Sequence, residues 1–136
     1  MPGDEIIDEE MEPDSELNRI SNDIIGAAIA VHRELGPGHL ESAYEKALAI
    51  EFNHRGIRFE RQVCLELRYR GEVVGEGRLD FLVDVRVIID LKAVERIIST
   101  HVVQMVSYLK MTKLKLGIII NFNVPVLKEG IRRVAN

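Results

Sequence analysis

A helical pattern between two short apolar strands is the feature that most limits how this chain can fold. Residues 85–93 and 114–122 are rich in β-branched side chains and have the length of strands. Between them, apolar residues return at helical spacing over about residues 97–111. A strand, a crossing helix and another strand imply a mixed sheet that is covered by helices.

The same two periodicities predict the other elements. A first helix has Ser15 or Asp14 as its cap and ends at Gly36-Pro37-Gly38. The expected elements are helices over about residues 17–35 and 39–54, strands over 58–70 and 73–83 separated by a turn at Gly71, and 126–134 as a last strand or a turn of helix. The predicted fold class is therefore α/β, in the order α-α-β-β-β-α-β with a small remainder.

Charge divides the chain into a tail and a body. The first sixteen residues hold eight acidic residues and no basic one, so we expect residues 1–14 to be a solvated, disordered tail. Residues 15–136 have the length of a single domain. Without those eight acids, 14 of the 22 remain against 18 Lys and Arg, so the body carries about +4 although the whole chain is −4.

Other features of the composition exclude several classes of protein. The start lacks a basic segment followed by an apolar one, and the longest apolar stretch, 24–31, is too short to span a bilayer. We therefore expect a cytoplasmic protein with no membrane contact. The single cysteine, Cys64, excludes an internal disulfide, a cysteine-based zinc site and an iron-sulfur cluster.

Charged residues interrupt two of the predicted strands. Asp90 and Lys92 are two positions apart, so both emerge on one side of the strand while Leu91 points to the other. The apolar residues 87–89 indicate a strand that is buried on both sides, where a carboxylate is costly unless it is paired or bound to a metal. Asp80 stands within the preceding strand. An ordinary ion pair on an exposed sheet face is the alternative for Asp90 and Lys92.

Polar residues also recur at helical spacing in two of the predicted helices. Glu41 and Tyr44 are one turn apart, and His101, Gln104 and Tyr108 lie on one stripe of a later helix. The simpler interpretation makes Glu41 a partner of the helix dipole, Tyr44 a core residue, and Gln104 and Tyr108 boundary residues. All four histidines are interpreted as exposed or capping.

The order of these residues resembles a known family. The pattern Gly38-x-x-Glu41-x-x-Tyr44, then Asp80, Asp90-x-Lys92 and Gln104-x-x-x-Tyr108 resembles the GxxExxY family, a branch of the PD-(D/E)XK nuclease superfamily. Its last element looks like the Q-x-x-x-Y motif of RecB-type nuclease domains. The resemblance covers about residues 17–134 and extends to Gly36-Pro37-Gly38 and Asn121-Phe122. Two positions depart from the superfamily signature: Leu79 replaces a proline, and Asp90 replaces the commoner glutamate.

The resemblance implies a restriction-endonuclease-like fold and a specific site. Asp80 and Asp90 would be metal ligands, with Glu41 joining them directly or through water and the main-chain carbonyl of Leu91 as a further ligand. Lys92 would act beside the attacking water. Gln104 and Tyr108 would support the site or touch the nucleic-acid backbone. The six expected catalytic residues are Glu41, Asp80, Asp90, Lys92, Gln104 and Tyr108.

Charge and donor chemistry add the expected cofactor and target. Three converging carboxylates would repel by about 4 kcal/mol per pair at an effective dielectric of 20, so they call for a cation. All-oxygen ligation favours Mg²⁺, with Mn²⁺ as the alternative ion, over zinc. Arginines that could bind phosphates are Arg55, Arg58, Arg61 and Arg78.

These features leave three hypotheses. The first is a Mg²⁺-dependent nuclease that hydrolyses phosphodiester bonds of nucleic acid, with DNA as the favoured target and RNA as the alternative. The second is a catalytically silent nuclease-fold module that binds nucleic acid or another protein. The third is a structural domain whose charged cluster is only an ion-pair network. Because the chain is small, any target selectivity is expected to come from a homodimer or a partner protein.

Overall fold

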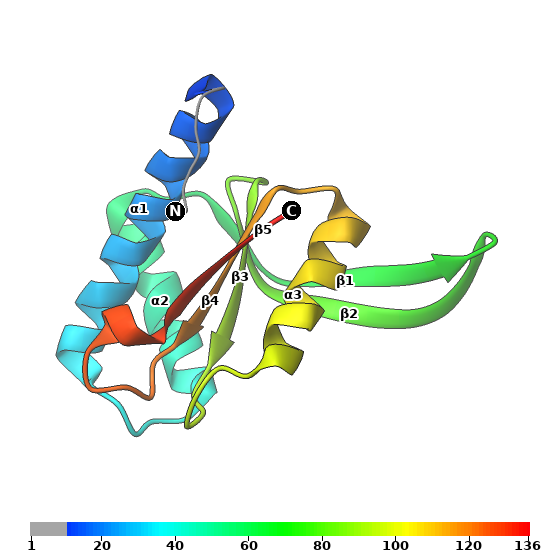
Figure 1. Ribbon diagram of the computed structural model, residues 1–136. Coiled ribbons are helices and arrows are strands. Elements are labelled where there is room, and N and C mark those ends of the chain that lie inside the picture. The colour runs from blue at the N-terminus through cyan, green and yellow to red at the C-terminus, as the bar shows by residue number, and fades with distance from the viewer. Residues whose placement is uncertain (1–10) are drawn as a thin grey trace.

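Five strands form one mixed sheet in the computed structural model, which describes residues 11–136 and their side chains from Ser15 onward (Figure 1). The strands lie in chain order across the sheet. They are β1 (Phe59–Tyr69), β2 (Glu72–Val83), β3 (Val87–Lys92), β4 (Leu116–Asn121) and β5 (Ile131–Ala135). Only β3 and β4 pair in parallel, and the other neighbours are antiparallel. The mixed sheet predicted from the sequence is therefore confirmed.

Three helices cover the two faces of this sheet. The helices α1 (Met11–Leu35) and α2 (Glu41–Arg55) pack together on one face, and α3 (Ser99–Thr112), which connects β3 to β4, covers the other (Figure 1). Two buried clusters correspond to these faces, one containing residues of α1 and α2 and one containing Met105 and Leu109 of α3. The central strands β3 and β4 are therefore buried on both sides, as their apolar sequences require.

The ends of the predicted elements shift modestly. The described part of α1 already includes Met11, before the predicted start near residue 17, so it covers the last part of the predicted acidic tail. The rest of that tail, residues 1–10, lies outside the described residues. The remainder of the chain contains both predicted alternatives, a short 3-10 helix η1 (Leu127–Gly130) followed by β5. Within the described residues, no helix combines the length and the apolar composition needed to cross a membrane.

The β1–β2 hairpin projects from the body of the molecule as an arm (Figure 1). Its turn is formed by Arg70 and Gly71, whose φ angles are 50° and 84°. Two successive positive φ angles are typical of the tight turn that matches the twist of a hairpin, and the second is easiest for glycine. The predicted turn at Gly71 is confirmed. A register shift between Leu67 and Arg68 adds a bulge near the end of the arm.

Candidate active site

Asp90 and Lys92 lie on the face of β3 that α3 covers. Ile89 and Leu91 alternate with them and belong to the cluster beneath α1 and α2. The Lys92 Nζ atom is 3.4 Å from Asp90 Oδ2, and the two side chains are only 19% and 14% exposed. The predicted placement of both charges on one side of a buried strand, with Leu91 on the other, is therefore confirmed.

Asp80 lies across from Asp90 on β2. The ladder pairs Phe81 with Ile89, so the next step of the register brings Asp80 opposite Asp90. Asp80 Oδ2 accepts a 2.7 Å hydrogen bond from the Leu91 main-chain nitrogen. In a regular ladder the Leu91 N–H group would donate to a main-chain carbonyl of the neighbouring strand. Here it donates to the Asp80 side chain instead, and this bond fixes the Asp80 carboxylate beside Asp90.

The environment of Asp80 disfavours its negative charge. Burial raises the pKa of Asp80 to about 7, and the neighbouring Asp90 carboxyl adds to the rise, while the hydrogen bond from Leu91 opposes it. Partial burial also raises the pKa of Glu41, with a further contribution from Asp80 and an opposing one from Lys92. Three acidic side chains therefore lie close enough to affect one another, beside a single lysine.

The regular alternation of side chains between the two faces of the sheet is interrupted in β1 and β2 next to this acidic group. Leu79 packs beneath α3 whereas Phe81, two residues later, packs beneath α1 and α2, although alternate residues of a regular strand share a face. Gln62, the residue of β1 at the same level, has a φ of 52°. A left-handed conformation costs a residue with a side chain roughly 1–2 kcal/mol, so local contacts must hold it in place.

Glu45 supplies those contacts. One of its carboxylate oxygens, Oε2, accepts hydrogen bonds from Gln62 Nε2 at 2.7 Å and from Arg61 Nε at 3.3 Å. Glu45 follows Glu41 by one helical turn, and its charge also contributes to the raised pKa of Asp80. The contacts of Glu45 therefore join the start of α2 to β1 at the level of Asp80.

The polar stripe of α3 extends from Lys92 toward β2. His101 Nδ1 accepts a 3.1 Å hydrogen bond from the Ile98 main-chain nitrogen and so caps the helix. Burial lowers the pKa of His101, and the nearby Lys92 adds to this effect. At the other end of the stripe the Tyr108 ring lies over Gly77, where an added Cβ would be 2.7 Å from Tyr108 Cε1. Gln104 lies between them and is exposed.

One of the four histidines contradicts its predicted role. His101 is the capping residue that the sequence predicts. His32 is buried, and its Nε2 atom is 2.8 Å from the Val124 carbonyl oxygen. The prediction of an exposed or capping residue is therefore wrong for His32, because its partner comes from a loop 92 residues later in the chain.

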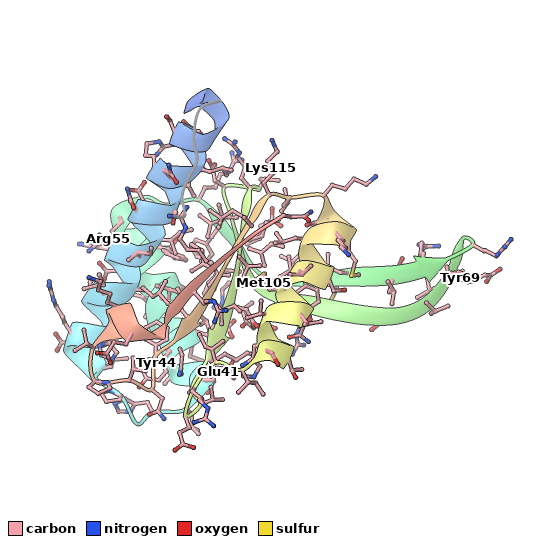
Figure 2. The ribbon with its side chains drawn as sticks, in the orientation of Figure 1. Glu41, Tyr44, Arg55, Tyr69, Met105 and Lys115 are labelled. Atoms are coloured by element: carbon pink, nitrogen blue, oxygen red, sulfur yellow. The ribbon has the colours of Figure 1, made fainter. Side chains whose placement is uncertain are left out.

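The four candidate phosphate-binding arginines do not form one surface. Arg61 contacts Glu45, and the exposed Arg78 lies two residues from Asp80 on β2. Arg55 is at the opposite end of α2 from Glu41, about 21 Å away at 1.5 Å per residue (Figure 2).

Arg55 and Arg58 instead line a pocket at that opposite end, together with Arg19. Each already has an acidic partner: Arg55 Nε is 2.7 Å from Glu51 Oε2, and Arg58 Nε is 3.8 Å from Asp84 Oδ1. The structure therefore does not place Arg55 and Arg58 beside Asp80 and Asp90, the carboxylates of the candidate site.

The segments around the site are fixed by contacts of three residues, Tyr44, Asn121 and Phe122. The buried Tyr44 donates a 2.6 Å hydrogen bond to the Gly36 carbonyl, and its ring stacks on Phe122 with centroids 4.5 Å apart. Asn121 Nδ2 donates to the Val94 carbonyl at 2.9 Å, which fixes the loop after β3 to the end of β4. These three residues position the segments that flank Glu41 and Lys92 rather than supplying charge.

The donor set fits a hard divalent cation. Among the side chains that the structure describes, no three from His, Cys, Asp and Glu are arranged as they stand to hold a metal ion. Mg²⁺, however, keeps several of its waters and is commonly held by one or two carboxylates together with substrate phosphates. Asp80 and Asp90 provide two such carboxylates, and burial, with a smaller contribution from Asp90, raises the pKa of Asp80, so a cation bound here would stabilise its charged form. Oxygen ligands favour Mg²⁺ or Mn²⁺ over zinc.

The fold and the site together make an α/β domain with a mixed sheet, a central parallel pair of strands, and carboxylates beside a lysine on a buried strand. The model of one protein family, described as the PD-(D/E)XK nuclease superfamily, matches residues 18–134. The chain therefore belongs to the PD-(D/E)XK nuclease superfamily, and the predicted restriction-endonuclease-like fold is confirmed. The same comparisons matched no curated protein and no solved structure.

Two residues of the site escape the sequence patterns. Glu45 belongs to a helix whose surface is rich in charge, and Gln62 directly follows the charged residues Glu60 and Arg61, so neither interrupts its surroundings. The only sequence signal for Glu45 is its spacing of one turn from Glu41. Gln62 has no such signal in the sequence, because the feature that distinguishes it is its strained backbone, which is visible only in the structure.

Proposed function

We propose that this protein is a Mg²⁺-dependent nuclease of the GxxExxY branch, that it hydrolyses phosphodiester bonds, and that DNA is its main target. The observation that carries the proposal is the placement of Asp80 opposite Asp90, with Lys92 3.4 Å from Asp90 and all three groups largely screened from water. The Asp80 carboxylate, whose pKa is raised by burial and by the adjacent Asp90 carboxyl, favours binding of a cation between the two side chains, and the lysine beside them favours an anionic substrate.

Each residue of the site has a role in this proposal. Asp80 and Asp90 would hold the ion, with the Leu91 carbonyl as a further ligand and Glu41 contributing through water. When bound, Mg²⁺ polarises a phosphoryl oxygen, lowers the pKa of a water molecule and offsets charge on the leaving oxygen. Lys92 orients the attacking water and stabilises negative charge that develops on the phosphate.

The stripe of α3 provides the adjoining surface for the nucleic acid. Gln104 is exposed beside the site and Tyr108 lies over β2, so their polar groups can contact the backbone of a bound strand. Arg78 is exposed on β2, two residues from Asp80 along the chain, and unlike Arg55 and Arg58 it does not line the pocket at the far end of α2. Arg61 supports the site through Glu45.

The experiment that tests this proposal is cleavage of end-labelled duplex DNA, single-stranded DNA and RNA with Mg²⁺, with Mn²⁺ and with EDTA. We expect cleavage that requires the divalent ion and that falls about 100-fold or more in Lys92→Ala and Asp80→Asn. The exposed Lys128 lies in η1, so Lys128→Ala serves as the matched lysine control.

Two outcomes would reject the proposal. Cleavage that survives in folded Asp80→Asn and Lys92→Ala would show that another protein or another site is responsible. Binding to nucleic acid without any product, unaffected by EDTA, would instead establish the catalytically silent binding module.

A further inference from the structure

The outer edge of β1 is a long strand edge without a partner. The sheet order places β1 at one end, and in the described part of the chain it pairs only with β2. Its eleven residues include no proline and no lysine, the residues with which proteins commonly block such edges. The bulge near the end of the arm results from Val74 in β2, so the outer edge itself is not interrupted there.

An apolar row on β1 continues beyond the cover of α3. Val63 and Leu65 pack against the cluster beneath α3. The next two members of the row, Leu67 and Tyr69, are 45% and 66% exposed. Figure 2 shows Tyr69 near the end of the arm, away from the helices. An exposed apolar row next to an unpaired edge marks a surface that another strand can cover.

The charges that flank this row select a second copy of the chain as the occupant. Glu66 and Arg68 surround Leu67, and they already form a 2.6 Å ion pair within the strand. If two β1 strands run antiparallel with Leu67 opposite Leu67, each Glu66 lies opposite Arg68 of the other copy, and each Leu65 lies opposite Tyr69. Opposite charges and apolar groups facing each other are the pairs that stabilise a sheet.

We propose that the protein forms a symmetric dimer in which two β1 edges pair antiparallel about a twofold axis at Leu67. Registers centred one residue away are unfavourable, because they place Glu66 opposite Glu66 or Arg68 opposite Arg68. A register centred on Leu65 places Tyr69 opposite Arg61 and separates Glu66 from Arg68. Only the register at Leu67 satisfies the apolar row and the ion pairs together.

The dimer also has a consequence for the proposed nuclease, and this consequence rests on the proposed function. The twofold axis is perpendicular to the shared sheet, so both copies present α3 on the same side. Gln62, at the level of Asp80, is five residues from Leu67, or about 17 Å along the strand. The two sites would therefore be separated by about 34 Å along the strand direction, comparable to one turn of duplex DNA.

Charge reversal at the edge tests the dimer independently of cleavage. The full chain has a mass of 15.4 kDa, and in analytical ultracentrifugation we expect its apparent mass to approach twice that value as the concentration rises. Either single variant, Glu66→Arg or Arg68→Glu, places like charges opposite each other at two symmetry-related positions in the dimer. Each should raise the dissociation constant of the dimer about tenfold or more. The double variant Glu66→Arg/Arg68→Glu should restore it. A mixture of the two single variants should form a heterodimer, because both cross pairs are then opposite in sign.

Circular dichroism would verify that these exposed variants fold, and Lys128→Glu is the control for a charge change away from the edge. A wild-type chain that stays monomeric at all concentrations would overturn the proposal. Single variants that dimerise as the wild type does would also overturn it. Loss of DNA binding in the single variants of a monomeric chain would assign the arm to nucleic acid instead.

Discussion

Replacing Asp80 by asparagine removes a negative charge that the folded protein disfavours. Folding raises the pKa of Asp80 from 3.8 to about 7, so the folded protein binds a proton there more tightly than the unfolded chain does. The stability that this group contributes is therefore complete below about pH 4 and is lost as the pH rises to about 7. Without metal, wild-type protein should become less stable over this range, and Asp80→Asn should not show that loss.

The magnitude follows from the size of the pKa rise. A change from 3.8 to about 7 corresponds to about 4 kcal/mol for a group fully shielded from water. Solvent screening at this partly exposed position reduces the figure to about 1–2 kcal/mol. The asparagine oxygen can still accept the hydrogen bond from Leu91, so little is lost in exchange. Above about pH 7 the variant should therefore be more stable than wild type by about 1–2 kcal/mol.

Urea denaturation in EDTA, followed by circular dichroism at several pH values, measures this difference. Asp23→Asn, at an exposed position on α1, is the matched control and should change stability by only a few tenths of a kcal/mol. In saturating Mn²⁺ the wild-type protein should instead be more stable than Asp80→Asn, because the ion stabilises the wild type alone, by about 2.7 kcal/mol at 100 times the dissociation constant. The reasoning is refuted if Asp80→Asn is the less stable protein at neutral pH in EDTA.

The remaining predictions concern the framework of the fold. Val85 is exposed with a φ of 56°, so Val85→Gly should relieve strain and raise stability by about 1 kcal/mol; an unchanged melting temperature would contradict this. An added Cβ at Gly117 would overlap the Met105 sulfur, so Gly117→Ala should cost about 1–3 kcal/mol in urea denaturation, and a neutral result would show that α3 shifts freely. Tyr44→Phe loses the hydrogen bond to Gly36 and should cost about 1–2 kcal/mol. The folded Tyr44→Phe protein should keep most of its cleavage activity, and a loss as large as that of Lys92→Ala would give Tyr44 a direct role.

Local patterns were sufficient to predict the sheet and the charged strand. Side-chain alternation fixes Asp90 and Lys92 on one face of β3, and the apolar residues around them fix the burial of that strand. The helix between β3 and β4 likewise determines that these two strands run in parallel. Each of these features depends on neighbours within a few residues, so the sequence alone reveals them.

Features that depend on distant contacts were not predictable. His32 is buried because its ring binds the Val124 carbonyl, and Gln62 keeps a strained backbone because Glu45 binds its side chain. Arg55 is near Arg61 in the sequence, but α2 carries it to the opposite end of the molecule from the acidic residues. Sequence spacing therefore gave no reliable measure of distance between these groups.

The central claim is that Asp80 and Asp90 together bind one divalent ion beside Lys92. Anomalous diffraction from crystals soaked in Mn²⁺ tests it most directly, because the signal identifies the ion and its position. We expect one strong peak in contact with a carboxylate oxygen of each aspartate, and we expect this peak to be absent in Asp80→Asn crystals treated in the same way. A peak elsewhere, or no peak at these aspartates in wild-type crystals, would contradict it.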